Sequence, residues 1–278
     1  MTHRPHPPRT WLFVPGADAK AHAAAQRSSA DVLIHELEDF TPPALRPQAR
    51  ALAPALYARW RAAGALVAVR VNPLETCGRE DLAAVLAGRP DFVMMSKVAS
   101  PEQVRRLARI TGRGVALVPN IETAAGLVRT YDIVRASPQV VAALVASEDM
   151  VADLGTARSR VGGELAYVRA RFLVECRAAG VEAIDCPYTF SDVRGATAEA
   201  RGAKRLGYRA KSLVSPAHAA ALNRVFTPSA AEIARARRIV AAFEQARAAG
   251  RERAHVGGLL VEVPVYAAAK RLLDGLGD

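Results

Sequence analysis

The sequence predicts an α/β protein whose strands close into a (β/α)8 TIM barrel. Short apolar runs recur between Thr10 and Val214 and alternate with amphipathic stretches, as parallel strands joined by helices do. Eight runs can be identified, which is the number that closes this kind of barrel. An open doubly wound sheet is the alternative, but neither a GxGxxG motif after the first run nor a Walker loop supports it.

The first four predicted strands each end at a turn signal or at polar residues. The first stops at Pro15-Gly16, and Asp18 is placed to cap the helix that follows. The second runs into Glu38-Asp39, and a long amphipathic helix with a glycine stop comes next. These strands are Thr10–Val14, Asp31–Leu37, Leu66–Asn72 and Asp91–Met95, with predicted helices at Pro42–Gly64 and Pro101–Ile110.

The last four predicted strands recur at a similar spacing, with one longer interval between the sixth and the seventh. The fifth and the sixth are each followed closely by an acid. The seventh ends at Asp185, and the eighth is followed by Ser215-Pro216. The strands are Val115–Val118, Val140–Ala146, Val181–Ile184 and Tyr208–Val214, with helices within Gly162–Gly180 and at Asp192–Leu206.

Residues 1–225 are therefore predicted to form the barrel, and residues 226–278 a C-terminal helix and lid segment. Ser229–Ala249 reads as a long helix that starts with a capping box. A hinge at Gly250 and Gly257-Gly258 leads into the final segment, Leu259–Leu276. This extension could cover an active site, its own or a neighbouring subunit's, or it could be a simple packing helix.

The charge and the cysteines limit the classes of partner. The net charge is +11, which favours anionic partners. The arginines are scattered over amphipathic helices, so a substrate carboxylate or a polyanionic cofactor fits at least as well as nucleic acid, which we do not expect. The three cysteines have no metal-site spacing, and no apolar run is long enough to cross a bilayer. We expect a cytoplasmic protein without a membrane partner.

Two acids at adjacent strand ends predict a metal site. Glu122 follows the fifth strand and Asp149 follows the sixth. The carboxyl ends of barrel strands carry the chemistry, and two carboxylates with few other ligands suit a hard ion such as Mg²⁺. The alternative is that each acid caps a helix or pairs with an arginine.

Charged residues on the second and third strands extend this site. Arg70 shares a face with Asn72 inside an apolar strand, where an arginine is costly to bury unless it is paired. It could clamp a carboxylate or a thioester oxygen, or form a salt bridge to Glu36 or Glu38, and both roles can coexist. His35 faces the other way and is expected to pack under a helix rather than to bind a ligand.

Several motifs in order resemble the citrate lyase beta-subunit family, part of the HpcH/HpaI aldolase/citrate lyase superfamily, and within it the malyl-CoA and citramalyl-CoA lyases. They are LFVPG at 12–16, LED at 37–39, RVN at 70–72, SKV at 96–98, IETAAGL at 121–127, SEDMVADLG at 147–155, AID at 183–185, FTPSAAEI at 226–233 and VEVPV at 261–265. The resemblance covers nearly the whole chain.

The resemblance implies a Mg²⁺-dependent barrel, often a homotrimer, that cleaves or forms a carbon–carbon bond in a 3-hydroxyacyl-CoA thioester. Citramalyl-CoA or malyl-CoA would give acetyl-CoA, or a homologue, and a 2-oxo acid. A CoA-independent 2-oxo acid aldolase and a catalytically impaired binding paralogue are the alternatives.

By position, the resemblance also assigns residues. Glu122 and Asp149 match the metal ligands, and Arg70 matches the arginine that holds the thioester or enolate oxygen. Phe13 and Lys20 match contacts to substrate and CoA. Glu36 and Glu262, which we assign as catalytic together with Arg70, stand where the family usually has aspartates, and Glu262 matches the base of the C-terminal lid.

Overall fold

Eight parallel strands hydrogen-bond in chain order, and β1 also pairs with β8, so that the sheet closes into a barrel without an edge. The protein is seen here as a computed structural model, which describes residues 7–276. The predicted (β/α)8 fold is confirmed. The strands are β1 Thr10–Pro15, β2 Val32–Glu36, β3 Leu66–Val71, β4 Phe92–Met95, β5 Ala116–Ile121, β6 Ala142–Val145, β7 Glu182–Asp185 and β8 Ala210–Leu213.

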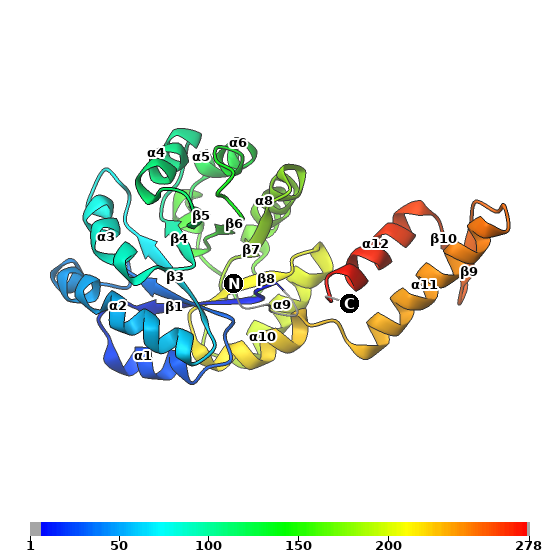
Figure 1. The fold of residues 1–278 in the computed structure, drawn as a ribbon, viewed down its shortest axis with the longest axis horizontal. Helices are drawn as coiled ribbons and strands as arrows, with labels where there is room; N and C mark the ends of the chain where they lie inside the picture. Colours follow the sequence, from blue (N-terminus) through cyan, green and yellow to red (C-terminus); the bar gives the residue numbers. More distant parts are fainter. Residues whose placement is uncertain (1–6, 277–278) are drawn as a thin grey trace. The chain divides into compact units, whose positions relative to one another are not determined.

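Helices surround the barrel (Figure 1). The helices α3, α5, α6, α7 and α10, of four to eight residues, were not predicted, because they are shorter than the window in which a helical period can be recognised. The α-helices are α1 Ala19–Gln26, α2 Arg46–Ala62, α3 Gly78–Val85, α4 Pro101–Thr111, α5 Ala124–Leu127, α6 Thr130–Val134, α7 Glu148–Asp153, α8 Ala166–Ala179, α9 Val193–Leu206 and α10 Ala219–Phe226. Short 3₁₀ turns lie at Pro43–Leu45, Leu86–Gly88, Gly163–Leu165 and Pro216–His218.

Alternation along the strands separates two hydrophobic clusters. The larger one packs the outer faces of the strands against the helices. The smaller one fills the inside of the barrel with side chains such as Trp11, Ile34, Met94 and Val118. Further along the same inward faces, polar residues replace apolar ones. These buried polar side chains therefore lie together at the carboxyl ends of the strands.

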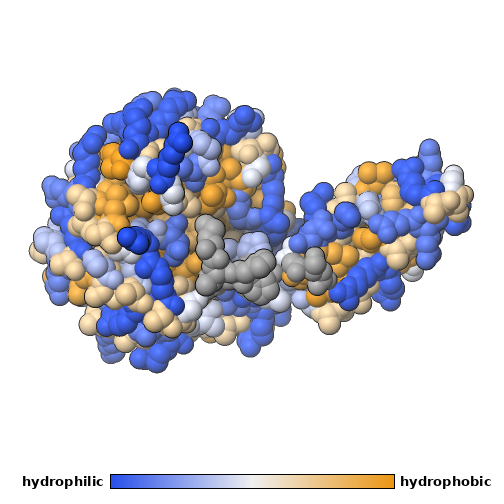
Figure 2. Space-filling model, in the orientation of Figure 1, coloured by the Kyte–Doolittle hydropathy of each residue, from blue (hydrophilic) through white to orange (hydrophobic). Residues whose placement is uncertain are grey.

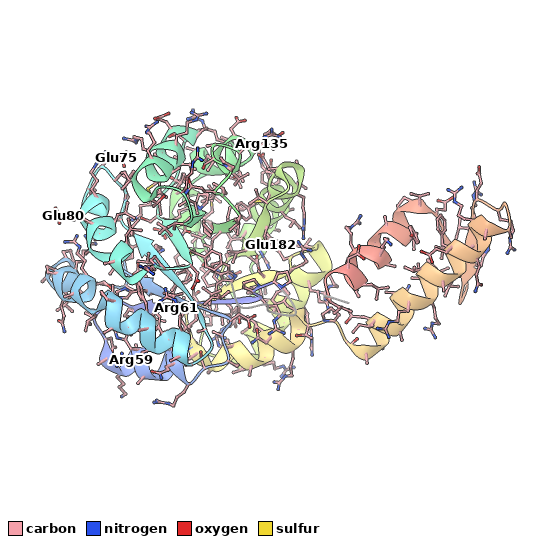
Figure 3. All side chains as sticks on the ribbon, viewed as in Figure 1. Arg59, Arg61, Glu75, Glu80, Arg135 and Glu182 are labelled. Atoms are coloured by element: carbon pink, nitrogen blue, oxygen red, sulfur yellow. The ribbon has the colours of Figure 1, made fainter. Side chains whose placement is uncertain are left out.

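Most surface charges lie away from this interior. Hydrophilic residues cover the periphery of the barrel unit, with hydrophobic ones nearer its middle (Figure 2). Glu75, Glu80 and Arg135 lie at its outer edge (Figure 3). Glu80 pairs with Arg50 at 2.9 Å, and Glu75 pairs with Arg106. In the part of the chain that the structure describes, no helix has the length and apolar character needed to span a membrane.

The chain divides into two compact units, and the barrel unit ends at Phe226. The second unit contains α11 Ala230–Ala248, the strands β9 Ala254–Val256 and β10 Leu259–Val261, and α12 Val263–Asp274. Ser229 and Glu232 form the predicted capping box of α11. The predicted hinge at Gly257-Gly258 was wrong: both glycines have positive φ and form the two-residue turn of the β9–β10 hairpin.

His35 is a buried structural residue, as predicted, and connects the turn after β1 with the helix α2. Its Nε2 lies 3.0 Å from the carbonyl oxygen of Gly16, and its Nδ1 lies 3.0 Å from the hydroxyl of Tyr57. A carbonyl only accepts, so Nε2 carries the proton and Nδ1 accepts from Tyr57. Burial lowers the pKa of His35 from 6.5 to about 4, so the imidazole is neutral at pH 7.

This burial predicts a loss of stability in acid. Below pH 6.5 the unfolded chain protonates His35 while the folded chain does not, down to about pH 4. The free energy of unfolding should therefore fall by up to about 3 kcal/mol over this window because of His35 alone. Urea unfolding of the wild type and of His35→Gln at pH 7 and pH 4.5 measures the effect. Equal pH dependence in the two proteins would contradict it.

Candidate active site

Arg70 is the centre of a charged cluster at the carboxyl end of the barrel. Its Nε donates to Glu36 Oε1 at 2.9 Å, and its Nη2 lies 3.2 Å from Glu38 Oε2. Its Nη1 lies 3.7 Å from Glu122 Oε1, and its guanidinium carbon lies 4.8 Å from the centre of the Phe13 ring. Arg70 thus makes both of the predicted salt bridges and still lines a cavity.

Glu36 is fully buried and its carboxylate is fully engaged. Besides Arg70, it accepts from the backbone N–H groups of Glu38 at 2.7 Å and Phe40 at 2.8 Å. A carboxylate that accepts several charge-assisted bonds is held rigidly and is poorly placed to take a substrate proton. The role of Glu36 in catalysis remains a prediction, and the geometry favours orientation of Arg70 as that role.

Glu122 presents the opposite situation. It directly follows β5, its side chain is fully buried, and neither carboxyl oxygen has a hydrogen-bond partner among the described residues. Burial raises the pKa of Glu122 to about 8; nearby Asp149 and Glu38 add to the rise, and Arg70 opposes it. A buried acid without hydrogen bonds is costly, so it marks a place where a cation or a proton is expected.

Asp149 lies in the first turn of α7, directly past β6, and it is half-buried. Because β5 and β6 are neighbours, the predicted pair of acids comes together at adjacent strand ends. Asp149 lines a cavity of about 440 Å³, together with Phe13, Arg70 and side chains from the loops after β2, β6 and β7. The cavity therefore opens where barrel enzymes carry their active sites.

The charges of the cluster fit a divalent cation. Acidic groups outnumber the two cationic ones, Arg70 and Lys97; the acids are Glu36, Glu38, Asp39, Glu122 and Asp149. Residues 7–276 contain no group of three or more His, Cys, Asp or Glu side chains arranged to hold a metal. Two carboxylates whose ion keeps waters for substrate to displace are a known magnesium arrangement, and Glu122 with Asp149 fits it.

Lys97 and Glu38 also belong to this cluster; Glu38 was predicted only as a salt-bridge partner for Arg70, and Lys97 was not assigned a role. Lys97 is the second residue after β4 and has a left-handed conformation, with a φ of 55°. Its Nζ donates to Glu38 Oε1 at 2.6 Å and lies 3.5 Å from Asp39 Oδ1. Their position at strand ends, where polar residues follow apolar runs, is the sequence signal that could have found them.

Two further predicted residues are Lys20 and Glu262. Lys20 is exposed in the first turn of α1, whose N-terminus is capped by Asp18 as predicted, and it is not among the residues that line the cavity. Glu262 belongs to the second unit, where it precedes α12 and its Oε1 lies 3.3 Å from Arg253 Nε. Their roles remain predictions.

The fold and the site together define a class: a (β/α)8-barrel enzyme with an acidic site around one arginine at the carboxyl ends of its strands. Comparison with known proteins then gives the family. The sequence model of the HpcH/HpaI aldolase/citrate lyase family matches residues 9–216, and the chain belongs to this family. The predicted resemblance and the assignment as a carbon–carbon lyase are confirmed at the level of the family.

Relatives of known name cover nearly the whole chain. Citrate lyase subunit beta of Escherichia coli K12 is 32% identical over 96% of this chain and 92% of that protein. The (3S)-malyl-CoA thioesterase of Cereibacter sphaeroides ATCC 17025 is 33% identical over 94% of this chain and 92% of that protein. Protein CitE of Mycobacterium tuberculosis, solved with magnesium, acetoacetate and coenzyme A, is 29% identical, with a TM-score of 0.78 over 98% of this chain and 99% of that one. The chain is thus a CoA-ester lyase or thioesterase of this family, and the predicted magnesium cofactor is confirmed in this solved relative.

Proposed function

We propose that this protein is a Mg²⁺-dependent lyase that cleaves, or in reverse forms, the carbon–carbon bond of a 3-hydroxyacyl-CoA thioester. Citramalyl-CoA and malyl-CoA are the proposed substrates, with acetyl-CoA and a 2-oxo acid as products. The observation that carries the proposal is the buried carboxyl of Glu122, which has no hydrogen-bond partner among the described residues and lies 3.7 Å from Arg70, a residue that lines the cavity. The magnesium and coenzyme A bound to the Mycobacterium tuberculosis relative support it.

Each residue of the cluster has a proposed role. Glu122 and Asp149 would hold the ion, which when bound lowers the pKa of the substrate hydroxyl and offsets its developing charge. A base removes the hydroxyl proton, and the electrons of the breaking carbon–carbon bond move onto the thioester. Arg70 donates hydrogen bonds to the thioester oxygen as charge develops there, and Glu36 and Glu38 hold its guanidinium in place.

A panel of CoA esters tests the proposal. Malyl-, methylmalyl-, citramalyl- and citryl-CoA are incubated with the protein, with Mg²⁺ and with excess chelator, and the acyl-CoA and 2-oxo acid products are measured. Cleavage of one ester that the chelator abolishes is the expected result. Folded protein that cleaves none of them would overturn the proposal and favour a CoA-free aldolase or a binding paralogue. Equal turnover of CoA-free hydroxy acids would favour the aldolase.

Hydrolysis of the thioester is a second candidate, because a named relative is a (3S)-malyl-CoA thioesterase. The same panel separates the two reactions. A lyase releases acetyl-CoA and no free thiol, whereas a thioesterase releases free CoA and the intact hydroxy acid. A thiol reagent added to each reaction distinguishes them directly.

Magnesium binding is expected to depend on pH through Glu122. With a pKa of about 8, most of this carboxyl is protonated at pH 7 in the metal-free protein, and the ion needs the carboxylate. Binding should therefore release up to about one proton per chain at pH 7, and the affinity should rise with pH until about pH 8 and then level off. Calorimetric titrations in two buffers of different ionisation enthalpy measure this release. Heats at pH 7 that do not depend on the buffer would contradict it.

Glu262 is proposed as the base, from the family resemblance. Replacing it by glutamine should lower kcat by about 10²-fold or more, since general bases contribute on this scale, and should leave magnesium affinity unchanged. Glu252→Gln, an exposed acid of the same unit, is the matched control. Full activity of Glu262→Gln would exclude this role.

The C-terminal unit is proposed to act as a lid, and the protein to be a homo-oligomer, with three subunits as the proposed number. Sedimentation equilibrium measures the number of subunits. A monomer at assay concentration would refute the oligomer.

A further inference from the structure

Asn120 is a buried polar residue with unsatisfied hydrogen-bonding groups. Its side chain is fully buried, and neither its amide nitrogen nor its amide oxygen has a hydrogen-bond partner among the described residues. Buried amides are nearly always hydrogen-bonded, because leaving one unpaired destabilises the fold. An apolar side chain of similar size would avoid this cost, so the asparagine needs another explanation.

The position of Asn120 relates it to Glu122. Both follow Val118 on the inward face of the β5 segment, because side chains of a strand alternate and Val118 belongs to the cluster inside the barrel. The register pairs Asn120 with Leu144 of β6, and Leu144 lines the cavity. Asn120 is therefore the strand neighbour of a residue that lines the cavity, and Glu122, whose carboxyl also lacks a hydrogen bond among the described residues, is the next inward residue.

Two other polar side chains on the inward faces, those of Ser212 and Glu36, already have partners. Ser212 of β8, for example, shares its face with Ala210 and donates to the carbonyl oxygen of Asp185 at 3.0 Å. Glu36 accepts from Arg70 and from two backbone N–H groups. Asn120 and Glu122 thus combine an unused donor with unused acceptors on neighbouring inward positions of one strand.

We propose that Asn120 is a positioning residue for Glu122, and that its amide N–H donates to the Glu122 carboxylate when that carboxylate holds magnesium. The inference rests on the proposed magnesium site. Carboxylates that bind metals are commonly oriented by a hydrogen bond on the oxygen not used for the metal, and loss of such a partner lowers metal affinity by about 10- to 100-fold. Because the two ends of an amide have nearly the same shape, a flip of the Asn120 amide exchanges its oxygen for an N–H within the same volume.

Magnesium affinity and thermal stability test this role together. Metal-free wild type, Asn120→Leu, Asn120→Ala and the control Ser212→Ala are titrated calorimetrically with MgCl₂, and each is melted without metal. Asn120→Leu removes an unpaired amide, so its Tm should not fall, while its magnesium Kd should rise about 10- to 100-fold. Asn120→Ala, which cannot overpack the site, should show the same change in Kd. Ser212→Ala loses a satisfied hydrogen bond and should keep the wild-type Kd.

The outcomes separate this inference from the proposed function. Equal magnesium affinity of the wild type and both Asn120 variants would overturn the positioning role and leave the proposed function standing. A lower Tm of Asn120→Leu with an unchanged Kd would show a merely structural residue and overturn it as well. A wild type that binds no magnesium would overturn the proposed metal site itself.

Discussion

Replacement of Glu122 by glutamine is expected to lower kcat/KM for the CoA ester by at least about 10³-fold, and to weaken magnesium binding by at least about 10²-fold. Glutamine keeps the shape of the side chain but removes the negative charge that the proposed ion needs. The variant should fold at least as well as the wild type, because it replaces a buried acid whose oxygens have no hydrogen-bond partner. Steady-state kinetics at saturating magnesium, calorimetry and the Tm measure the three effects.

A matched control is available at the other end of the barrel. Glu182 is the first residue of β7, at the amino ends of the barrel strands, and pairs with Arg209. Glu182→Gln should keep its activity and its magnesium affinity. Normal turnover by Glu122→Gln would remove the central residue of the proposed site.

Replacement of Arg70 by lysine is expected to lower kcat/KM by about 10²- to 10³-fold, the usual effect of losing a hydrogen-bond donor to a developing oxyanion. Lysine keeps the charge but cannot reach Glu36, Glu38 and Glu122 at once, as the three nitrogens of the guanidinium do. Arg70→Met should in addition lower the free energy of unfolding by about 3 kcal/mol, because it leaves these buried acids without their shared cation. Kinetics and urea unfolding of both variants measure these changes.

Arg169 supplies the comparison for Arg70. It is a buried arginine that donates to both oxygens of Asp185, at 2.7 Å each, on the outer side of the barrel strands. Arg169→Lys should lose stability while the folded fraction keeps its kcat. Comparable losses of kcat in Arg70→Lys and Arg169→Lys would mean that Arg70 acts only through stability.

The barrel could be predicted because its signals are local and repeated. Each strand is a short apolar run with a clear stop, and the predicted strands recur in the structure with boundaries shifted by a few residues; β5, for instance, continues to Ile121 instead of stopping at Val118. Glu122 and Asp149 were predicted because each closely follows such a run, and parallel strands bring those ends together. The same reasoning paired Arg70 with Glu36 and Glu38.

What could not be predicted depends on contacts between distant residues. Lys97 contacts Glu38 across 59 positions of sequence, and no local pattern indicates which acid a lysine will reach. The missing hydrogen bonds of Asn120 and Glu122 are properties of a packed interior. The glycine pair at Gly257-Gly258 was assigned to a hinge because the three-residue strands on either side are too short to recognise from their pattern.

The rate of ester cleavage by the wild type, measured against the free magnesium concentration, is the decisive test of the proposed metal-dependent reaction. The rate is expected to vanish in chelator and to saturate with magnesium, with acetyl-CoA or a homologue and a 2-oxo acid formed in equal amounts. Cleavage that continues unchanged in chelator would contradict the role given to Glu122 and Asp149. Release of free CoA in place of an acyl-CoA product would contradict the proposed carbon–carbon lyase reaction.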